Sequence, residues 1–180
     1  MTSHVRVARL RSRQGMTLIE LCIVLIILGI LMVGAVASLM RARVVANESS
    51  ATAMLRTITK AQLAFYAECG RGFYALSLTQ LGSPRPGRNV SYLAEDISLV
   101  DYPQRNGYRF SVRPAADAVP GTSDCGGSTT RTTYYASAVP VALGRTGDRS
   151  FATSQSNAIY ATAGVVPPME PLGPPAQLVH

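Results

Sequence analysis

The sequence predicts an α+β protein, in which a long N-terminal helix packs by its second half on a small antiparallel sheet. Three observations lead to this prediction. The stretch from Leu21 to Met40 carries no charged residue, an amphipathic helical pattern follows it, and short segments of alternating apolar and polar residues fill the second half of the chain. Consecutive short strands with tight turns favour antiparallel pairing.

The composition indicates a folded protein with an unusual N-terminus. Of the 180 residues, 47% are hydrophobic and only 15% are charged, which argues against intrinsic disorder. The net charge is +7, but the first fifteen residues contain four arginines and no acid. Because much of the basic excess lies in this leader-like segment, it is weak evidence for nucleic-acid binding.

The apolar run has the length of a membrane span, roughly 30 Å at about 1.5 Å per residue. A cleaved secretory signal is excluded, because the run is too long and no A-x-A site precedes the polar region that starts at Arg41. A signal anchor fits the length, and the leader arginines would place residues 1–15 in the cytoplasm. Neither design explains Glu20 at the edge of the run.

Glu20 is costly if it lies at membrane depth, by about 2.5 kcal/mol or more without a partner. It is solvated at little cost if it lies in the headgroup layer instead. Cleavage between Gly15 and Met16 would create an ammonium group close to the bilayer. A Glu20 carboxylate on a neighbouring copy could pair with that ammonium, and the pairing would set the axial register between subunits.

The segment RQGMTLIELCIVLIILGIL resembles the cleavage site and N-terminal helix of type IV pilins and type II secretion pseudopilins. The resemblance implies that a prepilin peptidase cuts after Gly15 and N-methylates Met16, and that Glu20 aids filament assembly. Met16 replaces the commoner phenylalanine, and Ala37 stands where many members have a proline that kinks the helix.

The resemblance continues over residues 39–82 and 134–164. The chain as a whole divides into five parts. We expect a leader (1–15), a transmembrane and assembly helix (16–40), its amphipathic second half (41–70), a globular sheet domain (71–165) and a proline-rich, mobile tail (166–180). The amphipathic stripe comprises mainly Val44, Ala51, Met54, Leu55, Ile58, Ala61 and Phe65. Gly70 and Gly72 are expected to end the helix.

The globular part begins with a largely irregular segment, in which Ser77 can cap a short helix over Ser77–Leu81. Alternation and β-branched or aromatic content then predict the strands Tyr108–Arg113, Thr132–Val139, Ser150–Thr153 and Ala158–Thr162. Gly144–Gly147 and Asn157 are turn signals. Related pilins usually carry an Asp-x-x-Gly turn before the last strand, and here Ser154–Asn157 takes that place.

Three cysteines have different expected roles. Cys22 lies in the apolar run and is interpreted as a small packing residue. Outside the cytoplasm, Cys69 and Cys125 could form a disulfide, worth roughly 4 kcal/mol by loop-closure entropy. The alternative is a pair of free thiols.

Catalytic and metal-binding patterns are missing from the sequence. The two histidines are His4 and His180, and there is no Cys-His pairing, HExxH, CxxC or Walker-type loop. Glu95 and Asp96 belong to no recognisable motif. Asp124 and Asp148 are loop carboxylates, but two of them fall short of the six to eight oxygens that calcium requires. We therefore expect no enzyme activity, no cofactor and no metal.

Together these features predict a structural subunit of a type IV pilus-like filament. It would enter the bacterial inner membrane as a single-pass precursor with a cytoplasmic N-terminus, and would later join a periplasmic or extracellular fibre. Its partners would be prepilin peptidase, the assembly platform, lipid, and copies of itself and other pilins. The alternatives are a type II secretion pseudopilin, a DNA-uptake pilin and a signal-anchored periplasmic enzyme. For DNA uptake the candidate residues are Arg85, Arg88, Arg105, Arg109, Arg113 and Arg131, although we expect a solvated surface there.

Overall fold

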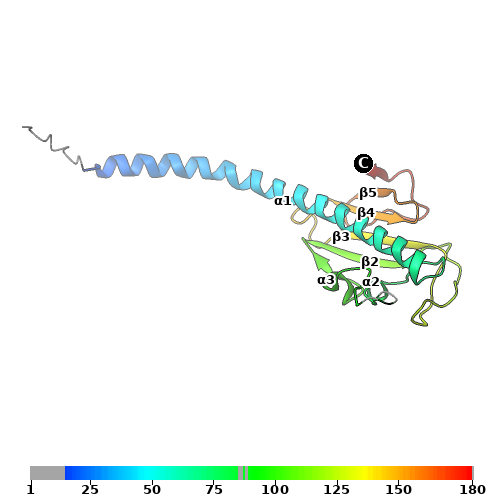
Figure 1. The fold of residues 1–180 in the computed structure, drawn as a ribbon. Helices are drawn as coiled ribbons and strands as arrows, with labels where there is room; N and C mark the ends of the chain where they lie inside the picture. Colours follow the sequence, from blue (N-terminus) through cyan, green and yellow to red (C-terminus); the bar gives the residue numbers. More distant parts are fainter. Residues whose placement is uncertain (1–14, 85–86, 88, 180) are drawn as a thin grey trace, which may run out of the picture. The chain divides into compact units, whose positions relative to one another are not determined.

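The computed structural model describes residues 15–84, 87 and 89–179, except for the side chains of residues 32–37 (Figure 1). The chain divides into two compact units, one ending at Leu39 and one beginning at Met40. The predicted leader, apart from Gly15, therefore lies outside the described residues.

Helix α1 spans Leu18–Glu68 and contributes to both units. The sequence predicts one continuous helix over residues 16–40 and 41–70, and the prediction of one long N-terminal helix is confirmed. In the part of the chain that the structure describes, no helix combines the length and apolarity needed to cross a membrane. The predicted span includes residues 32–37, whose side chains, Ala37 among them, lie outside the described set.

In its described residues, the second unit contains one antiparallel sheet and two short helices besides α1. Its six strands lie in sequence order from β1 to β6, and every neighbouring pair is antiparallel. The elements are α2 (Leu78–Leu81), α3 (Glu95–Ser98), β1 (Gln104–Arg105), β2 (Tyr108–Pro114), β3 (Tyr134–Pro140), β4 (Arg149–Ser154), β5 (Ile159–Ala163) and β6 (Gln177–Val179). The structure confirms α2 and the four predicted strands, and adds α3, β1 and β6.

Figure 1 shows the second half of α1 lying across the sheet, and buried side chains of both elements belong to one hydrophobic core. Leu55 and Ile58 of the predicted stripe are fully buried and belong to one cluster with Phe110 and Phe151 of the sheet. The stripe also contains buried polar residues that the apolar pattern does not predict. Gln62 is one of them, and its amide exchanges hydrogen bonds of 3.0 and 2.9 Å with the backbone of Ala75.

The C-terminal end of α1 is closed by the predicted glycines. The Gly70 N–H donates to Phe65 O at 2.7 Å, and the Gly72 N–H donates to Tyr66 O at 3.0 Å. Gly72 has a φ of 88°, which favours glycine. The chain then turns back toward the body of α1, where Gln62 holds it.

The proline-rich segment that the sequence predicts as a mobile tail (166–180) contacts the sheet through several of its described residues. The Tyr135 hydroxyl donates to Pro168 O at 2.6 Å, and Arg113 forms an ion pair of 2.7 Å with Glu170. Burial raises the pKa of Tyr135 to about 12, and the Arg113 charge partly opposes this rise. Beyond the prolines, Gln177–Val179 form β6 on β5. Prolines cannot donate hydrogen bonds, but their carbonyls still accept them.

Glu48 ties α1 to the start of β4 through a largely buried carboxylate. Its Oε1 accepts from the Asp148 and Arg149 N–H groups at 2.9 and 3.2 Å, while its Oε2 accepts from the Arg149 guanidinium at 2.9 and 2.6 Å. Hydrogen bonds to charged groups contribute more to stability than neutral ones do, and removing the Glu48 carboxylate would leave four part-buried donors without this acceptor.

Replacing Glu48 by alanine is therefore expected to lower the free energy of unfolding by about 2 kcal/mol. Urea unfolding of the purified protein measures this loss. The matched control is Asp96→Asn, which breaks an exposed ion pair with Arg105. It should change stability by less than about 0.5 kcal/mol, because surface ion pairs contribute little. Equal losses in the two variants would contradict this account.

Candidate processing and assembly site

The residues at the predicted cleavage site precede the first turn of α1. Gly15, Met16 and Thr17 are not helical, and the helix begins at Leu18. The Glu20 N–H donates to Thr17 Oγ1 at 3.2 Å. The side chain of Thr17 therefore caps the helix, and T-x-x-E is the spacing of a capping box. The cap starts the helix just after the predicted cleavage site.

The predicted scissile residues are accessible from solvent. Gly15 and Met16 are both exposed, and a Cβ added at Gly15 would meet no atom within 4 Å. Exposed, non-helical backbone is where proteolytic cleavage concentrates. The geometry is therefore suitable for cutting between these two residues.

Glu20 lies in the first turn of α1 and is exposed. A carboxylate at this position interacts favourably with the partial positive charge of the helix N-terminus. The structure therefore leaves this carboxylate available to a partner.

The first part of α1 exposes apolar side chains on every side. Leu18 is 82% exposed and Ile30 71%, and the apolar residues of 21–31 are exposed throughout. Cys22 is exposed with them and is a free thiol. A helix that is apolar all round is normally buried in a large core or a membrane. In a single copy this segment is unburied, and exposed apolar surface of this kind marks an interaction site.

Comparison with known proteins bears on this same segment. Residues 10–36 match the family model of the prokaryotic N-terminal methylation motif. The chain carries a prepilin-type signature. This signature is that of type IV pilins and pseudopilins, and the match includes Gly15, Met16 and Glu20. Neither the curated proteins nor the solved structures give a match to the chain.

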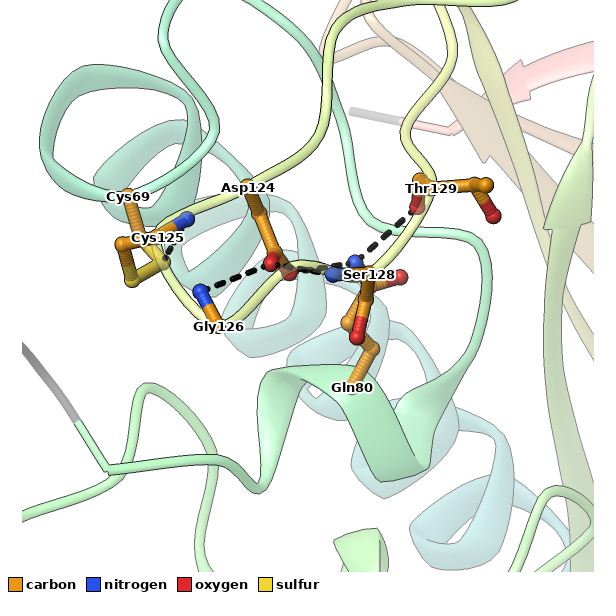
Figure 2. Close-up of a disulfide and its surroundings, with 7 residues drawn as sticks. All are labelled: Cys69, Gln80, Asp124, Cys125, Gly126, Ser128 and Thr129. Atoms are coloured by element: carbon orange, nitrogen blue, oxygen red, sulfur yellow. Dashed lines mark hydrogen bonds between the residues drawn. A yellow bond between two sulfur atoms is a disulfide. The ribbon is translucent and has the colours of Figure 1, made fainter.

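The globular unit that accompanies the prepilin-type signature contains the predicted disulfide, between Cys69 and Cys125 (Figure 2). The two Cα atoms are 4.9 Å apart, and the Cys125 N–H donates to Cys69 O at 3.1 Å. The bond joins the residue after α1 to the loop before β3. It therefore tethers the longest irregular loop of the domain to the end of the helix.

Asp124 organises the loop beside this disulfide, as Figure 2 shows. Its Oδ1 accepts from the Gly126 and Ser128 N–H groups at 2.9 and 2.8 Å, and its Oδ2 accepts from Gln80 at 2.8 Å. Gln80 also donates to Thr129 O at 3.1 Å. Asp124 is thus a buried acceptor that holds the loop to α2.

The second calcium candidate lies elsewhere in the domain. Asp148 is exposed at the start of β4, and its N–H donates to Glu48. Within residues 15–84, 87 and 89–179, no group of three or more His, Cys, Asp or Glu is placed to hold a metal.

Two of the arginines considered for DNA binding contact different acidic residues. Arg105 forms an ion pair with Asp96, and Arg113 pairs with Glu170 while lying 4.1 Å over the Tyr135 ring. Arg85 and Arg88 lie outside the described residues.

Proposed function

We propose that this chain is a filament-forming subunit of the type IV pilin kind, made as an inner-membrane precursor. Prepilin peptidase would remove residues 1–15 on the cytoplasmic side and methylate Met16. The observation that carries the proposal is the methylation motif, placed on an exposed helix that is apolar on every side. The accessible, non-helical backbone at Gly15 and Met16 supports cleavage at that bond.

The same helix would lie first in the membrane and later in the fibre. Residues 16–40 would first hold the precursor in the bilayer and then pack with the corresponding helices of other copies in the fibre. Van der Waals packing between apolar helices replaces lipid contact with protein contact, so extraction need not expose apolar surface to water. The partners of this helix, first in the membrane and then in the fibre, would be lipid, the assembly platform and other pilins.

The globular unit would form the outer part of such a fibre and would have no catalytic activity of its own. A stable sheet, a disulfide and a tethered loop suit a protein that leaves the cytoplasm, because disulfides persist in oxidising compartments. A pseudopilin of a type II secretion system carries the same N-terminal signature and is the alternative function.

Replacing Gly15 by valine tests the processing step. A Cβ added at Gly15 meets no atom within 4 Å, so the fold should be unaffected. We expect the full-length precursor to accumulate in the membrane fraction and fibres to disappear from the sheared fraction. Membrane fractionation, with immunoblotting for the size of the protein, measures both. Ser12→Val in the leader is the matched control and should be processed normally. Normal fibres from the Gly15→Val chain would contradict the proposal.

A further inference from the structure

The segment between α3 and β1 exposes three large apolar side chains that have acidic residues close by in the sequence. Leu99, Val100 and Tyr102 are 70%, 55% and 67% exposed. Asp101 lies among them, and Glu95 and Asp96 occupy the first turn of α3 just before. We call residues 99–102 the acidic knob. Exposed apolar patches rimmed by polar residues often mark protein interaction sites.

A basic groove lies on another part of the same unit. It has a volume of about 270 Å³ and is lined by four residues of α1 and one of the β4–β5 turn, namely Arg56, Thr59, Lys60, Leu63 and Asn157. Leu63 is 55% exposed and supplies apolar surface. Arg56 and Lys60 are exposed and supply two positive charges. The groove therefore complements the knob in both charge and polarity.

The knob and the groove lie at different strands of the sheet. The knob leads directly into β1, the first edge strand, and Asp96 is tied to Arg105 of that strand at 2.8 Å. The groove reaches the turn between β4 and β5, with β2 and β3 lying in between. Strands are about 4.8 Å apart, so these positions are separated by roughly 15 Å or more. No knob residue lines the groove of its own copy.

We propose that the acidic knob of one copy docks into the basic groove of a second copy. This inference rests on the proposed filament function and names a contact between its globular units. Two different complementary patches on one chain form a heterologous contact, which builds an open helical array when the rotation does not close. Opposite charges orient the two copies, and burial of Leu99, Tyr102 and Leu63 stabilises the contact.

A cysteine pair tests the contact in fibres made from the full chain. We expect Leu63→Cys combined with Tyr102→Cys to give, under oxidising conditions, a ladder of dimers, trimers and longer species on a non-reducing gel. Both positions are exposed, so the fold should be preserved. The variants with only one introduced cysteine are controls, because they show which cross-linked bands come from disulfides to the free Cys22. Co-assembled single variants should give cross-linked dimers only, because each copy then contributes one half of a contact.

Charge reversal gives an independent readout. Lys60→Glu and Asp101→Lys should each lower the yield of sheared fibres roughly tenfold, because like charges then face each other. The combined variant should restore the yield to within about twofold of the parent. Arg145→Glu, in the loop between β3 and β4, is the control and should leave the yield unchanged.

The outcomes separate this contact from the assembly on which it rests. Parent fibres that give no ladder with the cysteine pair, or only dimers, would overturn the knob-and-groove contact while leaving the filament function standing. Failure of the charge-swapped chain to recover would overturn it as well. If the parent chain makes no fibres at all, the filament function fails, and this contact fails with it.

Discussion

Replacing Glu20 by alanine is expected to abolish fibre formation while leaving cleavage after Gly15 and methylation of Met16 intact. Glu20 lies beyond the scissile bond, in the first turn of α1, and its side chain is exposed. The bond to be cut keeps its non-helical backbone, because the Thr17 cap uses the N–H of residue 20 and not its side chain.

The physical reason for the loss is the charge of Glu20. In the bilayer, an unpaired carboxylate costs about 2.5 kcal/mol or more. In the fibre, the methylated amine of Met16 on a neighbouring copy remains cationic and can pair with it. Without the carboxylate, one buried cation per subunit is left unpaired, and breaking a buried pair in this way costs about 3–5 kcal/mol. A loss of that size at every subunit should prevent growth of the fibre.

Glu20→Gln is the matched control for shape, because glutamine can also occupy the last position of a capping box. If the negative charge of Glu20 is what assembly requires, the Glu20→Gln variant should assemble as poorly as the Glu20→Ala variant. Fibre yield in the sheared fraction and the mass of the processed protein are the two measurements. Normal fibres from either variant would show that the Glu20 charge does not set the register.

Removing the disulfide is expected to cause the largest loss of stability in the globular unit. Cys69 and Cys125 are 56 positions apart, and closing a loop of this size contributes roughly 4 kcal/mol by the chain-entropy estimate. In Cys125→Ser, the loop keeps the hydrogen bonds of Asp124 but loses its covalent tie to α1. Urea unfolding measures the change.

Cys22→Ser serves as the matched control, because Cys22 is a free thiol in the first unit. Its substitution should leave the unfolding of the globular unit unchanged. Reduction of the parent protein should lower stability about as much as Cys125→Ser does. A loss below about 1 kcal/mol in both cases would contradict the assigned role of the disulfide.

Features with local sequence signals could be predicted. The apolar stripe places Leu55 and Ile58 in the core, and both are fully buried. Ser77 caps α2 as expected, since its Oγ accepts from the Gln80 N–H at 3.1 Å. Asn157 takes the left-handed conformation with a φ of 62° and closes the β4–β5 turn. Each of these depends on residues a few positions apart.

Features that depend on distant residues could not be predicted. The elements β1 and β6 have two and three residues, too few for alternation to appear. The bond between Glu48 and Arg149 joins positions 101 apart, and no local pattern indicates it. Asp124 shows the same limit, because the sequence identifies it only as a loop carboxylate, and the backbone N–H groups that it accepts from are known only from the fold.

The candidate site also combines features with a local sequence signal and features that depend on distant residues. The motif around Gly15, Met16 and Glu20 is continuous in the sequence, and the family comparison matches it over residues 10–36. Thr17 and Glu20 have the T-x-x-E spacing of a capping box, a local signal from which the cap at Thr17 could have been predicted. The basic groove combines α1 with a turn some 100 positions later, so only the fold brings its residues together.

The intact mass of the protein recovered from membranes or sheared fibres tests the central claim most directly. Processing as proposed predicts a chain that begins at Met16 and carries one additional methyl group. The Gly15→Val precursor provides the unprocessed reference mass. A functional protein whose mass still includes the arginines of residues 1–15 would contradict the account.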